Sequence, residues 1–372
     1  MRYAPFRMER YQSTYEHRVE INLSESGVHP LTVRELLDLA GNNGTVDEVR
    51  LGYGQSNGSD ELRRRIAALY PGATDANVLV TVGGAEANFA SFWHLMEMEG
   101  KAAVLLPNYM QVPGLLESFG TEVFPVNLVE SEGWQPDLGA LESALKAGAR
   151  FVLVTNPNNP TGVALTEASM AAVTDLTLKH EAWILTDEVY SGAEAAGGVP
   201  TPSFWGRHER VLATNSLSKA YGLPGLRLGW IAGPTELMEG LWGRTDYTTI
   251  SPASLSDHLA TIALDPGTRT RILERTRGII RKNLGLMKDW MDSQEGRFHY
   301  QLPDAGAICY MRYDVPINST AFAEKMRTEK NVLVVPGDHF GMDSYLRLGT
   351  GNPEDELLEG LRRIRAAFDE VG

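Results

Sequence analysis

The sequence predicts an α/β protein in which a large domain with a mostly parallel central sheet is followed by a smaller α+β domain. Two observations predict this fold class. Between about residues 51 and 234, short apolar runs alternate with segments whose apolar residues recur at helical spacing. Beyond that region, long helical segments and a few strands replace the alternation. Strands that alternate with helices form right-handed crossover units, and their parallel sheet is buried on both faces.

Six apolar runs are expected to form the large sheet. In chain order they are NVLVTV, AAVLLP, FVLVTN, AWILTDEVY, RVLATNSLS and LGWIAGP. The intervening segment EASMAAVTDLTLKH has the spacing of an amphipathic helix. Residues 251–293 predict one or two long helices, followed by strands in FHYQLPDAGAICYMRYD and SYLRLGT and a closing helix in PEDELLEGLRRIRAAFDEV. We therefore expect an N-terminal arm at 1–45 that packs on the small domain, a large domain at 46–250 and a small domain at 251–372.

Composition argues against several classes of function. A formal charge of -14 repels polyanions, so nucleic acid and anionic membranes are not expected partners. The sequence has no run of 18 apolar residues and its first residues form no apolar leader, so a cytoplasmic protein is expected. Cys309 is the single cysteine, which excludes an intrachain disulfide and a thiolate metal cluster. No metal site is predicted.

Loops at the carboxyl ends of strands bind ligands in open α/β sheets, and two of these loops have unusual sequences. In GGAEANF, residues Gly83, Gly84 and Ala85 allow the backbone to approach a phosphate where a helix begins. In NPNNPTG, two prolines fix a turn that presents the amide of Asn159. Plain turns would also explain both loops.

Charged and phenolic side chains follow two further strands. Asp187 ends an apolar strand, where a carboxylate is costly to bury without a partner, and Tyr190 follows it. Lys219 also follows a strand, and an amine among small and apolar groups can act as a nucleophile toward a carbonyl. A helix-capping aspartate and a solvated lysine are the structural alternatives.

Together, these residues suit pyridoxal 5'-phosphate. This cofactor has a phosphate, a pyridine nitrogen that pairs with a carboxylate, a phenolic oxygen that accepts hydrogen bonds and an aldehyde that condenses with a lysine. In chain order, YGQSNGSDELR, GGAEANF, NPNNPTG, DEVY, SLSKAYGLPGLRLGW, VVPGDHFG and YLRLG resemble the motifs of fold-type I pyridoxal-phosphate enzymes, and specifically those of the class I/II aminotransferase family. The resemblance extends over nearly the whole chain.

The resemblance implies a role for each matched residue. Lys219 would form a Schiff base with the cofactor and carry the proton of the substrate α-carbon, Asp187 would pair with the ring nitrogen, and Asn159 and Tyr190 would bind the phenolic oxygen. The residues implied to bind the phosphate are Gly83, Gly84, Ala85, Ser216, Ser218 and Arg227, with Tyr53 reaching it across a homodimer interface. The active sites of such a homodimer would be shared.

The resemblance also implies contacts to the cofactor ring and to the substrates, an L-amino acid and a 2-oxo acid. Tyr109 would stack on the pyridine face, and Arg347 would bind the substrate α-carboxylate with both guanidinium nitrogens. The segment SESGVH, including Gly27 and Val28, falls where the family's arm covers the substrate. Transamination is thus the predicted reaction.

Several points stay open in the sequence. The motifs identify the cofactor but not the bond that breaks, so β-elimination, decarboxylation or a capreomycidine-synthase-like cyclisation of an arginine derivative is the alternative. A cofactor-binding sensor would need a basic DNA-binding segment, which this acidic chain lacks. Arg244 is a candidate to bind a distal carboxylate or is a surface residue. The arm residues Glu16, Glu20, Glu25 and His29 would face a basic side chain or only belong to an amphipathic arm.

Overall fold

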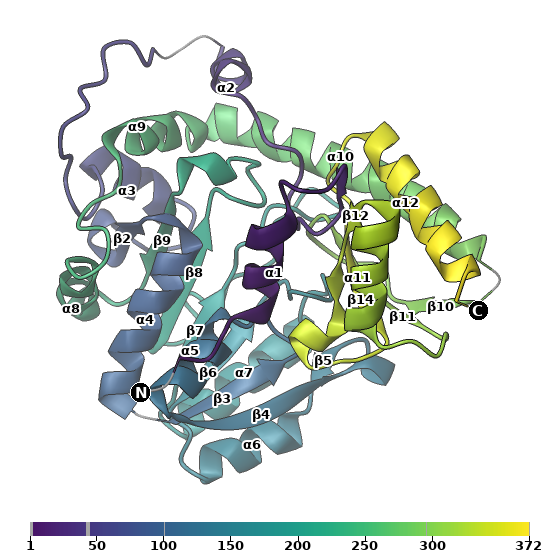
Figure 1. The fold of residues 1–372 in the computed structure, drawn as a ribbon. Coiled ribbons are helices and arrows are strands. Elements are labelled where there is room, and N and C mark those ends of the chain that lie inside the picture. The colour runs from purple at the N-terminus through teal and green to yellow at the C-terminus, as the bar shows by residue number, and fades with distance from the viewer. Residues whose placement is uncertain (1–2, 42–44, 100, 295, 372) are drawn as a thin grey trace.

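A computed structural model describes residues 3–41, 45–99, 101–294 and 296–371. The large domain is built on an eight-stranded sheet with the strand order β2-β9-β8-β7-β6-β3-β4-β5 (Figure 1). The strands are β2 (Val78–Thr81), β3 (Lys101–Leu106), β4 (Glu122–Val129), β5 (Gln135–Pro136), β6 (Phe151–Thr155), β7 (Trp183–Asp187), β8 (Val211–Ser216) and β9 (Gly229–Ala232). Strands β8, β7, β6, β3 and β4 pair in parallel, so their carboxyl ends meet at one edge. The predicted α/β fold with a largely parallel sheet is confirmed.

All six predicted strand segments contain strands of this sheet, although β9 runs antiparallel to both β8 and β2. Strand β4 was not predicted. Its sequence EVFPVNLV contains a proline and mostly exposed or half-buried positions, so it lacks the continuous apolar run of a central strand.

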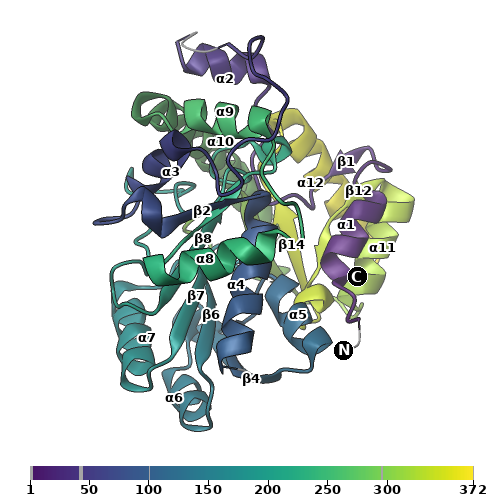
Figure 2. The same ribbon diagram turned by 90° about the vertical axis from the view of Figure 1, so that its left-hand side faces the viewer.

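Alternate residues of each central strand pack on opposite faces of the sheet. In β3, Ala102 and Val104 pack with helices α4 (Gly83–Glu99) and α5 (Gln111–Phe119). Ala103 and Leu105 pack on the other face, with the helices α6 (Leu138–Lys146) and α7 (Glu167–Lys179). Helix α8 (Thr235–Thr245) lies beside α4, as Figure 2 shows. Burial on both faces explains why these strands are continuous apolar runs.

The C-terminal part forms a four-stranded antiparallel sheet in the order β10-β11-β14-β13. Its strands are β10 (Phe298–Tyr300), β11 (Ile308–Tyr313), β13 (Val335–Pro336) and β14 (Tyr345–Gly349). The helices of this half are α9 (Ser254–Ala263), α10 (Pro266–Asp292), α11 (Ser319–Lys330) and α12 (Glu354–Asp369), so two helices occupy the segment 251–293.

The N-terminal arm joins the C-terminal part through β1 (Ile21–Asn22), which pairs in parallel with β12 (Val332–Leu333). The arm also contains α1 (Arg7–Tyr15) and α2 (Val33–Leu39), and α3 (Asp60–Ala67) follows it. Figures 1 and 2 both place α1 beside α11, at the edge where the large sheet meets the C-terminal part. The predicted boundaries at residues 45 and 250 stay predictions. None of the helices in the described ranges combines the length and apolarity needed to cross a membrane.

Candidate active site

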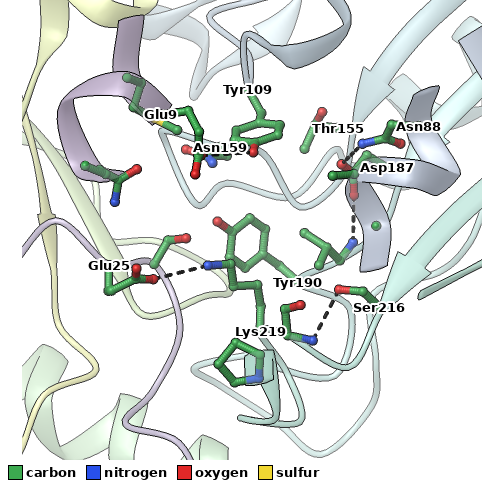
Figure 3. A pocket seen from close by; sticks show the side chains of 18 of the residues that line it. Glu9, Glu25, Asn88, Tyr109, Thr155, Asn159, Asp187, Tyr190, Ser216 and Lys219 are labelled. Atoms are coloured by element: carbon green, nitrogen blue, oxygen red, sulfur yellow. Dashed lines mark hydrogen bonds and ion pairs between the residues drawn. The ribbon is translucent and has the colours of Figure 1, made fainter. Parts of the chain in front are cut away.

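A cavity of about 400 Å³ lies where the carboxyl ends of the parallel strands face α1 and β14. Most of the predicted site residues line it, although they come from many different loops (Figure 3). These residues are Gly84, Ala85, Tyr109, Asn159, Asp187, Tyr190, Ser216, Ser218, Lys219, Arg227 and Arg347. The parallel topology brings these distant segments together.

Asp187, the last residue of β7, is held by two donors. The Nδ2 of Asn88 donates to its Oδ2 at 2.9 Å, and the backbone N–H of Val189 donates to its Oδ1 at 3.1 Å. Thr214 fixes Asn88 in turn, because its hydroxyl donates to the Oδ1 of Asn88 at 2.7 Å. Burial raises the pKa of Asp187, while both donors oppose that rise. A cation facing this carboxylate would stabilise its charged form.

Lys219 follows β8 and extends its amine into the cavity toward the arm. Its Nζ lies 3.4 Å from the Oε2 of Glu25, the contact drawn in Figure 3. The charge of Lys219 holds the pKa of the Glu25 carboxyl below its usual range. Gly27 packs against the same lysine, since a Cβ on it would lie 3.4 Å from the Lys219 Cδ. The arm therefore covers the side of Lys219 that lies away from the sheet.

A cradle suited to phosphate forms where β2 passes into α4. Gly83 has φ +77°, and a Cβ at this position would lie only 2.4 Å from the Nη2 of Arg227. Arg227 itself has a left-handed backbone with φ 46°, and its Nη1 donates to the carbonyl of Pro224 at 2.9 Å. Ser216 lies close by, because a Cβ on Gly84 would be 3.5 Å from its Cβ. A helix start, a guanidinium and a hydroxyl at one point fit an anion such as the cofactor phosphate.

Arg347 on β14 is almost completely buried, with 1% of its surface exposed. Its Nη1 donates to the Oδ1 of Asn159 at 2.9 Å, and its Nη2 donates to the carbonyl of Ser24 at 2.6 Å. Because Oδ1 of Asn159 faces the guanidinium, its Nδ2 is the atom left to donate to another group. Burial lowers the pKa of Arg347. A buried guanidinium at a cavity wall suits a carboxylate ligand.

Two tyrosines complete the cavity. Tyr190 is 1% exposed, and the absence of a side chain on Gly306 makes room for its ring, since a Cβ there would lie 2.9 Å from the Tyr190 Cδ1. Tyr109 contacts the arm: its ring centroid is 5.0 Å from that of Phe6, and its hydroxyl lies 3.5 Å from the Oε2 of Glu9. Burial raises the pKa of Tyr109.

The structure adds cavity residues that the sequence analysis did not assign. They are Met8, Glu9, Gln12, Asn88, Thr155, Val189 and Pro224. Asn88 had a signal, because it lies four residues after Gly84 and so shares its face of the helix. The residues of α1 had a weaker signal: Met8, Tyr11 and Tyr15 recur at helical spacing, but the helix is short and mostly polar, and only two of its side chains are buried.

Other candidates lie outside the cavity. Val28 is buried in the hydrophobic core, and Tyr53 is 90% exposed. Arg244 pairs with Glu97 and lies over the ring of Trp93.

Two of the four arm candidates also lie elsewhere. Glu20 pairs with Arg363, and the ring of His29 contacts the guanidinium of Arg275. Glu16 and Glu25 do line the cavity.

Comparisons with known proteins identify the family of this chain. The aminotransferase class I and II family matches residues 31–364. A capreomycidine synthase of Streptomyces vinaceus is 30% identical over 351 residues, which cover 93% of this chain and 89% of that protein. The structure of an aminotransferase of Streptococcus suis that depends on PLP superposes with a TM-score of 0.91 at 29% identity, covering 100% and 99% of the two chains. A PLP-dependent cyclase, OrfR, superposes with a TM-score of 0.89 at 25% identity, covering 100% and 99%.

The family match covers most of the chain, and its cofactor is the one that the cavity fits. The chain belongs to the class I and II aminotransferase family and is a fold-type I enzyme that uses pyridoxal phosphate.

Proposed function

We propose that this enzyme transfers the amino group of an L-amino acid to a 2-oxo acid. One observation supports this proposal above the others: a single cavity contains the amine of Lys219, the carboxylate of Asp187 and the buried guanidinium of Arg347. These three groups supply a proton carrier, an anchor for the cofactor ring and an anchor for a substrate carboxylate. Transamination requires all three at one place.

The cofactor would be held along its whole length. Arg227 and the start of α4 would bind the phosphate, and Asp187 would pair with the ring nitrogen. The Nδ2 of Asn159 and the hydroxyl of Tyr190 would donate to the phenolic oxygen. When bound, pyridoxal phosphate stabilises the negative charge that develops when a bond to the substrate α-carbon breaks. Asp187 supports this chemistry because its charge keeps the ring nitrogen protonated.

Lys219 and Arg347 act on the substrate. Arg347 binds the α-carboxylate in a bidentate manner and so fixes the orientation of the α-carbon. The Nζ of Lys219 removes the α-proton and returns a proton later, as a general base and then a general acid. The arm excludes water from this side of the lysine, because Gly27 packs directly on it.

The functional unit is proposed to be a homodimer. Tyr53 is 90% exposed, Leu51 is 84% exposed and Tyr247 is 81% exposed, which is unusual for large apolar and aromatic side chains. In a dimer, Tyr53 would reach the phosphate in the partner's cavity. This arrangement would explain why Tyr53 is absent from the cavity of its own chain.

A second candidate function is cyclisation of an arginine derivative. The long match to a capreomycidine synthase favours it, as does the position of Glu25 beside the amine of Lys219. Transamination uses the lysine as its single proton carrier, whereas a reaction that also breaks or forms a bond at the β- or γ-carbon benefits from a second acid-base group nearby.

One experiment separates the two candidates. The holoenzyme is mixed with single amino acids in the absence of an oxo acid, while cofactor absorbance, ammonia and new cyclic amines are measured. Conversion of the cofactor to its pyridoxamine form without ammonia supports transamination. Ammonia or a cyclised product, with the original absorbance restored, supports the lyase or cyclase. The Lys219→Ala variant is the control and is expected to give neither result.

A further inference from the structure

Hydrogen-bond acceptors line the part of the cavity that the arm covers. Helix α1 and its C-terminal residue contribute Glu9, Gln12 and Glu16, and the segment after β1 contributes Glu25. Side chains three or four positions apart share one face of a helix, so the first three form a strip along the cavity wall. We call these four residues the arm acceptors.

The three carboxylates of this set have little cationic compensation. Glu9 contacts the hydroxyl of Tyr109 at 3.5 Å, and Glu16 lies 3.5 Å from the exposed ring of His17. Among the described residues, no lysine or arginine pairs with either carboxylate. Within the described residues Glu25 forms one ion pair, with the amine of Lys219, and the more distant guanidinium of Arg347 also lowers its pKa.

Gln12 provides an independent indication of a ligand. It is 7% exposed, and its Nε2 donates both to the carbonyl of Ser24 at 2.8 Å and to the Ser24 hydroxyl at 3.1 Å. These contacts fix the orientation of the amide, and the Oε1 on its other side accepts no hydrogen bond from any described residue. This oxygen belongs to a side chain that lines the cavity, so it is open to a donor from a bound ligand. Gln12 is therefore a fixed acceptor on the wall of the space that a ligand would fill.

Charge balance in the loaded enzyme leads to the same conclusion. The phosphate would occupy Arg227, the substrate α-carboxylate would occupy Arg347, and the ring nitrogen would compensate Asp187. Lys219 must be neutral to act as a base, so its amine then brings no charge to Glu25. The arm carboxylates, Glu9 and Glu16 included, are left without a lysine or arginine partner among the described residues.

We propose that the arm acceptors bind a cationic side chain of the amino-acid substrate, and that a guanidinium suits them best. This inference rests on the proposed function, since it places the α-carboxylate at Arg347. A guanidinium is planar and carries five donors, so it can bind two carboxylates and the Gln12 oxygen together, whereas an ammonium has three donors. A negatively charged side chain would be repelled.

The position of Arg244 supports this choice. A substrate with a distal carboxylate needs a second free cation, but the guanidinium of Arg244 pairs with Glu97 and donates to the carbonyl of Gly240 outside the cavity. Within the described residues, the cations that line the cavity are Lys219, Arg227 and Arg347, and all three are already assigned.

The wild-type holoenzyme tests this directly with four amino acids. L-Arginine is compared with L-citrulline, its neutral isostere, and with L-lysine and L-glutamate, and the change in cofactor absorbance gives a Kd and a rate for each. We expect kcat/KM for arginine to exceed that for citrulline by about tenfold or more, the effect of losing a charge-assisted hydrogen bond. A kcat/KM for lysine that exceeds the value for citrulline also supports a cationic substrate. If kcat/KM for citrulline or for glutamate equalled that for arginine, the inference would be overturned, while the proposed function would stay intact.

Isosteric variants locate the effect. Glu9→Gln combined with Glu16→Gln should lower the arginine-to-citrulline ratio mainly through KM for arginine, with little change for citrulline. Glu20→Gln is the matched control, because Glu20 is in the same arm but pairs with Arg363. An unchanged ratio in the double variant would overturn the inference. If no amino acid alters the cofactor absorbance of the wild type, both proposals fail.

Discussion

Arg347 donates through Nη1 to the Oδ1 of Asn159 at 2.9 Å, and this bond couples the proposed carboxylate site to the proposed cofactor site. Each side chain fixes the other: the guanidinium determines which way the Asn159 amide faces, and Asn159 holds one end of the guanidinium. The Ser24 carbonyl of the arm holds the other end at 2.6 Å. Substrate and cofactor binding should therefore respond differently to substitutions of this pair.

Arg347→Lys should weaken substrate binding much more than cofactor binding. Lysine keeps the positive charge but cannot bind a carboxylate with two parallel donors, so we expect KM for the amino acid to rise by about 10- to 100-fold. The cofactor absorbance of the resting enzyme should shift only slightly, because the substituted amine can still donate one hydrogen bond to Asn159. Steady-state kinetics and an absorbance spectrum check both parts. An unaltered KM would remove Arg347 from the substrate site.

Asn88→Ala should weaken cofactor binding, because Asn88 donates to Asp187 at 2.9 Å inside the protein. Without this donor, the pKa of Asp187 should rise further and its charged form should pair less well with the ring nitrogen. Loss of a buried hydrogen bond to a charged group costs about 1.5–3 kcal/mol, which corresponds to roughly tenfold or more in the cofactor Kd. Thr214→Val, which removes the bond that orients Asn88, should have a smaller effect of the same sign. A cofactor titration that shows no change in either variant would contradict this role.

Gly83→Ala should destabilise the protein and disturb the phosphate cradle. The alanine Cβ would lie 2.4 Å from the Nη2 of Arg227 and would occupy a backbone with φ +77°. A left-handed non-glycine residue costs about 1–2 kcal/mol before the collision with Arg227 is counted. Gly84→Ala is the control for unfolding of the cofactor-free protein, since its Cβ would meet Ser216 at an ordinary 3.5 Å. Equal unfolding free energies for the two variants would show that no strain arises at Gly83.

The large sheet and the site residues that directly follow its strands could be predicted because their signals are local, whereas Tyr109, Arg227 and Arg347 were implied only by the family resemblance. Buried parallel strands are continuous apolar runs, and each predicted residue from Asp187 to Lys219 follows such a run within a few positions. The topology then brings the loops together without any further information from the sequence. The antiparallel direction of β9 has no local signal, because it depends on the strands with which β9 pairs. Strand β4 has none either, because its polar and half-buried residues do not form an apolar run.

The arm illustrates what the sequence could not show. Helix α1 buries Met8 and Gln12, while Tyr11 packs on the ring of His339 and Tyr15 under Arg327. Its apolar spacing can indicate a helix, but it does not tell which of its polar side chains line a cavity. That Glu16 and Glu25 line the cavity while Glu20 pairs with Arg363 depends on how β1 docks against β12. Such a long-range pairing is not visible in the spacing of the residues.

Tyr53 provides a test of the shared active site. If Tyr53 completes the partner's phosphate site, Tyr53→Phe should lower cofactor affinity by about three- to tenfold, the loss of one hydrogen bond. Mixing Tyr53→Phe with Lys219→Ala subunits should then restore full cofactor affinity at roughly a quarter of all sites, because each mixed dimer has one site with both native residues. A chain whose Tyr53 served its own cavity would give no such recovery. Light scattering of the same samples checks the dimer.

The last prediction concerns Glu188, the residue after Asp187. It is 3% exposed, and its Oε1 accepts from the Ser203 hydroxyl at 2.8 Å and from the backbone N–H of Phe204 at 3.0 Å. Burial raises the pKa of Glu188 from 4.5 to about 7. Since the folded state favours the protonated form, this carboxyl contributes its full stability below pH 4.5 and loses it as the pH rises through 7.

Glu188→Gln keeps an acceptor for both donors but cannot ionise. The Tm of the wild type relative to that of Glu188→Gln should therefore fall between pH 4.5 and about 7 and become constant at higher pH. Between pH 4 and pH 8, the unfolding free energy of the wild type should fall relative to that of Glu188→Gln by on the order of 3 kcal/mol. Thermal unfolding of both cofactor-free proteins across this range measures it. A Tm difference independent of pH would mean that Glu188 keeps an ordinary pKa in the folded protein, with its charge stabilised by the two donors.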